Sequence, residues 1–287
     1  MNMLRSVINP QSSRYTVCLT QAQNTPKIYG QAVYTSGERS ARLSFLLPQD
    51  EACSPATVNL LEDLAQTTGK RGLFNLLADL DEKSAALDCF RRAGFSIYGW
   101  QQIWRLPEEK NRLKATDTGW QRARSIDDLT IHSLFQSLVP PLFQSADPLS
   151  IQRIPRWVYR QGDDLLAYLE CHYGPKGVVV LPLIHPEVKS IDGLIRDIPA
   201  AVNTVTKRPV YLAVRSYQTW LEPSLNQWGA SASHRHSSLV KRLVVPQRET
   251  IPVNNPVLVK SRQAETGLPF LKQVLRKPQP KKDTSEG

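Results

Sequence analysis

Residues 85–106, "AALDCFRRAGFSIYGWQQIWRL", decide how the chain is interpreted. They predict a helix that ends at Gly94, because glycine readily adopts the left-handed backbone that closes helices. A strand rich in aromatic and β-branched residues follows. Towards the N-terminus, alternating and capped patterns predict a strand, strand, strand, helix, strand series at 14–21, 27–37, 40–49, 54–69 and 73–81. The first part of the chain therefore has the predicted order β-β-β-α-β-α-β.

A similar order returns after a polar linker at 108–117. It begins with a strand at 120–125 and a single long helix at 125–144, and it ends with a strand at 236–245. We therefore expect a mixed α/β (α+β) fold built from two related modules, at 14–107 and 118–245. The first module looks truncated and would leave a sheet edge or an apolar face open, so the two modules are expected to pack on one another.

Composition is typical of a globular protein, with 41% hydrophobic and 22% charged residues. Residues 246–287 are rich in Pro and Lys and predict a basic, mostly disordered tail. The net charge of +10 is compatible with an anionic partner. A solvated basic end explains it more simply, and nucleic acid is not the expected partner. The sequence has no signal-peptide or membrane-spanning pattern, so a cytoplasmic protein is expected.

Cysteine and histidine patterns do not predict a metal site. The four cysteines form no CxxC pair and are expected to be reduced core thiols. His234 and His236 would share one face of a strand and could bind a metal only with a third ligand such as His172 or His185. Solvated histidines are the simpler interpretation. No HExxH, GxSxG or P-loop motif occurs.

The predicted order of elements resembles that of the GNAT family of N-acetyltransferases. Residues 73–105 resemble the late strand, last helix and final strand of the family, and residues 118–143 resemble its opening strand and first helix. The resemblance implies two tandem GNAT-like (acyl-CoA N-acyltransferase) modules, each with a mixed central sheet flanked by helices. It further implies that acetyl-CoA binds in a V-shaped gap between two central strands, and that the acetyl group passes to a small amine or a protein amine.

The pyrophosphate-binding turn of the family departs from its pattern in both modules. The resemblance places the pyrophosphate on a turn patterned Q/R-x-x-G-x-G/A, where glycine lets backbone N–H groups approach the anion. The turn at 48–57 has no glycine and contains two carboxylates, and the turn at 185–193 has only Gly193, late in the segment. The second turn is the better candidate. Its candidate cofactor-binding residues are Val188, Lys189, Ser190 and Ile191.

The tyrosine that acts as general acid in many family members is also missing. The resemblance places it four residues before the glycine of the Gly-Phe corner, where this chain has Phe90 in the first module and Leu225 in the second. Neither side chain can donate a proton. Tyr98 or Tyr217 on neighbouring strands could substitute, although a packed role is the usual one for such tyrosines.

Glu170 and His172 are the candidate catalytic residues. They lie two apart on one predicted strand, a spacing suited to a general base that deprotonates an amine. The alternative is a pair of polar residues on a solvent-facing side. Two functions therefore stay open: an N-acyltransferase that is weak or catalytically degenerate, and a pseudoenzyme that serves as a non-catalytic ligand-binding or protein-interaction scaffold.

Overall fold

The computed structural model describes residues 12–19, 27–47, 53–108, 118–149, 154–202 and 208–243. The first half contains β1 (Ser12–Leu19), β2 (Ile28–Thr35), β3 (Ser40–Leu47), α1 (Pro55–Lys70), β4 (Asn75–Asp81), α2 (Ala86–Arg92) and β5 (Ser96–Arg105). The second half contains β6 (Trp120–Arg122), η3 (Ser125–Asp127), α3 (Asp128–Leu138), α4 (Pro141–Ala146), β7 (Arg156–Gln161), β8 (Asp164–Gly174), β9 (Gly177–Ile184), α5 (Ile191–Val202), β10 (Val210–Arg215), η4 (Ser216–Leu221), α6 (Glu222–Gln227) and β11 (Ser231–Arg242). The predicted tail and nearly all of the predicted linker lie outside the described residues.

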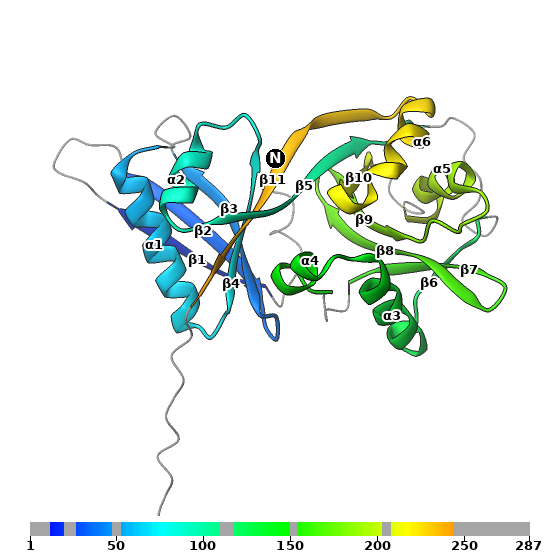
Figure 1. Cartoon of the computed structure of the whole chain (residues 1–287), viewed down its shortest axis with the longest axis horizontal. Coiled ribbons are helices and arrows are strands. Elements are labelled where there is room, and N and C mark those ends of the chain that lie inside the picture. The colour runs from blue at the N-terminus through cyan, green and yellow to red at the C-terminus, as the bar shows by residue number, and fades with distance from the viewer. Residues whose placement is uncertain are drawn as a thin grey trace, which may run out of the picture. The chain divides into compact units, whose positions relative to one another are not determined.

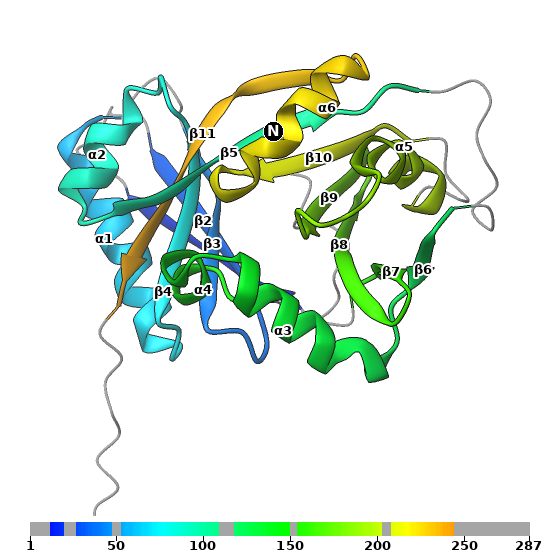
Figure 2. The same cartoon turned by 45° about the vertical axis from the view of Figure 1, so that its right-hand side comes forward.

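All eleven described strands form one mixed sheet in the order β1-β2-β3-β4-β11-β5-β10-β9-β8-β7-β6 (Figures 1 and 2). β11 pairs antiparallel with β4 over His236–Arg242, and β5 pairs antiparallel with β10 over Gln101–Arg105. The last strand of each half therefore lies between two strands of the other half. This exchange pairs β4 with β11 and β10 with β5, so that neither β4 nor β10 keeps an unpaired edge at the junction.

Each half contains one parallel strand pair that opens along its length. The pairs share only three residues on each strand: Ser40–Arg42 with Asn75–Leu77, and Val178–Val180 with Val210–Leu212. Beyond these residues both strands of each pair continue without pairing to one another. The sheet thus has a gap in each half, as expected of a GNAT-like fold.

Helices cover the two faces of the sheet unequally. On one face of the sheet, α1 and α2 cover the first half, and α5 and α6 cover the second half. The opposite face is covered by α3 and α4 (Figures 1 and 2). α4 also contacts the first half: the Asn75 side-chain amide donates to the Ser145 carbonyl at 3.2 Å, and the Ser40 hydroxyl donates to the Ala146 carbonyl at 3.2 Å. A helix of the second half thus packs on strands of the first.

The single helix predicted over 125–144 is wrong. The structure divides it into η3, α3 and α4, with Val139 in an extended conformation (φ −91°, ψ 126°). A residue that precedes proline is disfavoured in the helical region, and Pro140 follows Val139. Pro141 then begins α4, since proline suits the first position of a helix. The break turns α4 towards the first half.

Candidate functional site

The gap between β9 and β10 is closed by the side chain of Gln218. This residue lies in η4 with a non-helical backbone (φ −126°, ψ 24°), and it is 2% exposed. Its Oε1 accepts a hydrogen bond from the backbone N–H of Ile184 at 3.1 Å, and its Nε2 donates to the carbonyl of Pro182 at 3.0 Å. Both partners belong to the part of β9 that has separated from β10.

An extended ligand in this gap would need the same backbone groups. A strand that has lost its neighbour presents N–H and C=O groups that must be paired when they are buried. The carboxamide of Gln218 satisfies one N–H and one C=O, as an amide of a bound ligand would. A ligand must therefore displace Gln218 and replace two buried hydrogen bonds before it gains any contact of its own.

The candidate cofactor-binding turn already forms backbone hydrogen bonds within the protein. The N–H of Val188 donates to the His185 carbonyl at 3.2 Å, and the N–H of Lys189 donates to the Gln161 side chain at 3.4 Å. Val188 is 7% exposed and packs into the core. Two of the four predicted residues thus already use their N–H groups within the protein.

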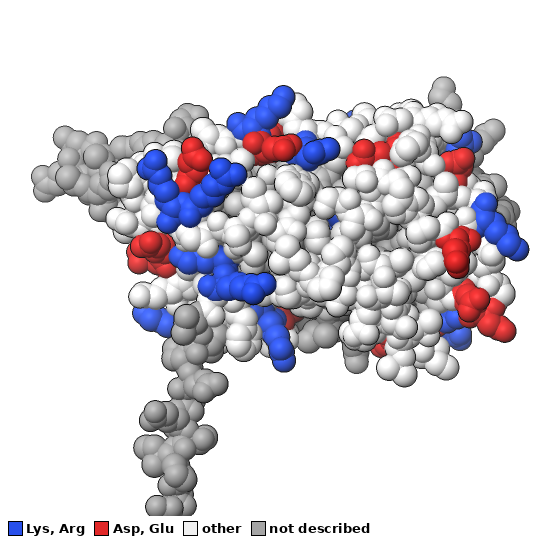
Figure 3. All heavy atoms as spheres, in the orientation of Figure 1, with Lys and Arg blue, Asp and Glu red and all other residues white. Residues whose placement is uncertain are grey.

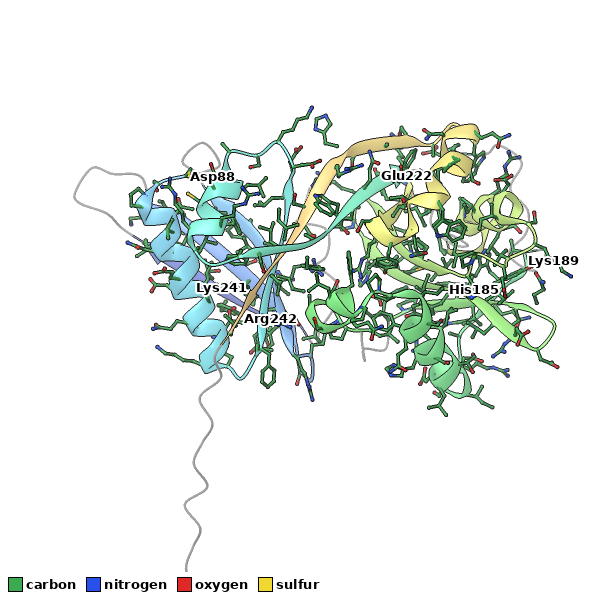
Figure 4. All side chains as sticks on the ribbon, viewed as in Figure 1. Asp88, His185, Lys189, Glu222, Lys241 and Arg242 are labelled. Atoms are coloured by element: carbon green, nitrogen blue, oxygen red, sulfur yellow. The ribbon has the colours of Figure 1, made fainter. Side chains whose placement is uncertain are left out.

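The other two candidates, Ser190 and Ile191, stand at the beginning of α5. The Ser190 carbonyl accepts from the N–H of Leu194 at 3.1 Å, and Gly193 lies inside the helix, away from the turn itself. Lys189 is exposed beside them (Figure 4). An anion at this position would meet a lysine and the start of a helix, without the flexible glycine-rich turn that lets the backbone wrap around it.

The positions expected for the general acid are core positions. Phe90 and Leu225 are both 0% exposed, and the Phe90 ring packs edge-on against Phe95 with a centroid distance of 5.0 Å. Their burial explains why apolar side chains are stable there.

The two alternative tyrosines also have packing roles. Tyr98 and Tyr217 both pack edge-on against the Phe143 ring, with centroid distances of 5.2 and 4.9 Å. Burial, together with the nearby Asp147 carboxylate, raises the pKa of Tyr98 above its usual value. A tyrosine that holds its proton so firmly is a poor acid for a thiolate leaving group.

Glu170 and His172 meet on β8 as the sequence predicts. The His172 Nε2 and the Glu170 Oε1 are 2.6 Å apart, and the two side chains are 21% and 13% exposed. They are paired across the sheet with Val179 and Leu181 of β9, respectively. Ile184, the last residue of β9 before the turn, lies three to five residues beyond these two partners, at roughly 10–17 Å. The structure thus joins the catalytic candidates to one another without bringing them to the cofactor-binding candidates.

A group of buried charges joins the two halves, and we call Arg42, Asp79, Asp147 and Arg215 the central ion cluster. Arg42 binds Asp79 at 2.5 Å and Asp147 at 2.9 Å, and Arg215 binds Asp147 at 2.5 Å. Their side chains are 13–21% exposed. Burial alone would lower the pKa of both guanidinium groups, but the carboxylates outweigh it and raise the pKa. Sequence analysis missed this cluster, although each arginine interrupts or ends an apolar strand.

A surface hollow with about 390 Å³ of space, open to solvent, lies where β5, β10, β11 and α6 meet. Trp100, which is 41% exposed, lines it together with Gln101, Glu222 and Arg235. Figure 4 labels Glu222 on α6. The lining combines an aromatic surface with one acidic and one basic side chain, which is suited to a small polar molecule.

The described histidines bring together no metal site. His234 bonds Asp81 at 3.1 Å, and no group of three or more metal-ligating side chains comes together within the described residues. On the face shown in Figure 3 the charged side chains gather towards both sides, and the middle carries few of them. Among the described helices, none combines the length and apolar character needed to cross a membrane.

Comparisons with solved structures find several acetyltransferases at low similarity to this chain. A GNAT-family acetyltransferase structure from Novosphingobium aromaticivorans has a TM-score of 0.49 and 14% identity, covering 74% of this chain and 89% of that one. A GCN5-related N-acetyltransferase from Sphaerobacter thermophilus has a TM-score of 0.48 and 12% identity, covering 75% and 76%. A tandem GNAT protein from the clavulanic acid biosynthesis pathway has a TM-score of 0.45 and 11% identity, covering 83% and 85%. No protein-family model and no curated protein matches the sequence.

Proposed function

We propose that this chain is an N-acyltransferase-like protein of GNAT-like fold that does not transfer acyl groups and serves as a non-catalytic scaffold. The observation that carries the proposal is the Gln218 side chain, which pairs with the buried backbone of β9 on the side that has separated from β10. The burial of Phe90 and Leu225 at the expected acid positions supports it. The surface hollow beside Trp100 is a place where such a scaffold would bind a small polar ligand.

An acyl-transfer assay tests this proposal. The full chain is incubated with acetyl-CoA and a panel of small amines and lysine peptides, and free coenzyme A is measured by chromatography. We expect no release above that of a heat-denatured sample. Chromatography is preferred to thiol reagents because two cysteines of the chain are themselves exposed. Turnover that depends on both the amine and the folded chain would overturn the proposal.

The second candidate function is acetyl transfer from acetyl-CoA to a small amine or a protein amine. The observation that favours it is the 2.6 Å contact between Glu170 and His172, in which the carboxylate holds the imidazole in the orientation that a general base needs. Under this candidate function, His172→Gln removes the activity, whereas Glu170→Gln lowers it, because the imidazole loses the carboxylate that orients it. Equal residual rates in both variants and in the parent would contradict it.

A further inference from the structure

Two of the four cysteines are not in the core. Cys89 and Cys171 are buried, as expected, but Cys18 and Cys53 are exposed. The prediction of four core thiols is therefore wrong for two of them, because the predicted elements did not show which side of β1 or of the α1 start faces solvent. The exposed Cys53 directly precedes Ser54, the residue that caps α1.

Cys53 and Cys89 lie together at the junction of α1 and α2. The Sγ of Cys89, on α2, is 3.9 Å from the carbonyl oxygen of Ser54. Ser54 directly follows Cys53 in the chain, so the Cys89 thiol lies beside the segment that carries the exposed Cys53. Burial and, after it, the nearby Cys53 side chain raise the pKa of Cys89 to about 12. The pair thus consists of one accessible thiol and one sheltered thiol that holds its proton.

We propose that Cys53 and Cys89 form a site of reversible oxidation, which a hydroperoxide converts into an intrachain disulfide. Cys53 reacts first because it is exposed. Its thiolate attacks the terminal peroxide oxygen, the O–O bond breaks, and an alcohol (water from hydrogen peroxide) leaves, so that Cys53 becomes a sulfenic acid.

Cys89 then completes the reaction. Its sulfur attacks the Cys53 sulfur, the S–O bond breaks, and the oxygen leaves as water with the proton of the Cys89 thiol. Two thiols lose two electrons and one peroxide gains them. The position of Cys89 beside the Cys53–Ser54 segment favours this second step over further oxidation of the sulfenic acid. The new bond ties the start of α1 to α2, and it is independent of the proposed function.

Peptide mapping tests the proposal on the full chain. The reduced protein is treated with one equivalent of hydrogen peroxide, alkylated in denaturant and digested with trypsin. Cys53 and Cys89 fall in different tryptic peptides, 43–70 and 84–91, and Cys18 falls in 15–27. We expect a linked 43–70/84–91 pair as the main oxidised product, and its disappearance after treatment with dithiothreitol.

Three variants make the result specific. Cys53→Ser and Cys89→Ser should each abolish the linked pair, and Cys89→Ser should also increase labelling of Cys53 by dimedone, which traps sulfenic acids. Cys18→Ser, the matched control at the other exposed cysteine, should leave the linked pair unchanged. The proposal is overturned if Cys89 of the parent chain remains fully alkylated while Cys53 is oxidised to sulfinic acid or linked to a second chain.

Discussion

Replacing Asp147 with alanine is expected to lower the free energy of unfolding by about 3–5 kcal/mol. Asp147 is the carboxylate shared by Arg42 and Arg215, at 2.9 and 2.5 Å. Without it, two largely buried guanidinium groups face one another and only Arg42 retains a carboxylate, that of Asp79. Removing one partner of a buried ion pair destabilises the fold by more than the intact pair stabilises it, because the remaining charge is left without water or a partner.

Urea denaturation followed by circular dichroism measures this effect. The matched control is Asp88→Ala on α2, whose side chain is 72% exposed and lies 3.8 Å from Arg91. An exposed pair of this kind contributes at most about 1 kcal/mol, so the control should unfold near the parent midpoint. Equal midpoints for Asp147→Ala and Asp88→Ala would show that the central ion cluster does not stabilise the junction of the two halves.

Replacing Gln218 with leucine should lower the free energy of unfolding by about 2–5 kcal/mol. Leucine fills a similar volume but cannot bond the N–H of Ile184 or the carbonyl of Pro182, so two buried backbone groups lose their partner. Each unsatisfied buried group costs about 1–3 kcal/mol. The loss of stability should be largest in the part of β9 that has separated from β10, because no strand pairs with that segment on the side of the gap.

Hydrogen exchange and denaturation together test this second prediction. The amide of Ile184 should exchange faster in Gln218→Leu, while that of Val180, in the paired part of β9, should change only with global stability. Gln227→Leu, at an exposed position of α6, serves as the matched control and should change the exchange rate of neither amide. Unchanged protection at Ile184 in Gln218→Leu would mean that the glutamine does not hold the gap closed.

The sequence predicts the local elements of this fold well, because they depend on neighbouring residues. Gly94 adopts a positive φ of 79° at the end of α2, and Gly229 does the same after α6. The contact between Glu170 and His172 also follows from spacing alone, since residues two apart on a strand share a face. These features need no knowledge of distant parts of the chain.

Features that depend on distant contacts could not be predicted. The segment "PVYLAVRSYQ", residues 209–218, predicts a strand that extends to Gln218, whereas β10 ends at Arg215 and η4 turns the glutamine back onto β9. The exchange of β5 and β11 depends on pairing between segments far apart in the chain, as the Ile103–Ser233 contact across 130 residues illustrates. The central ion cluster likewise joins four separate segments.

A calorimetric titration of coenzyme A into the full chain tests the central claim most directly. Because Gln218 already bonds the backbone that borders the gap of the second half, we expect no saturable heat up to millimolar coenzyme. Gln218→Ala, which empties the gap, provides the comparison titration. Saturable binding to the parent chain at micromolar concentration, accompanied by faster exchange of the Ile184 amide, would contradict the claim that the gap is closed.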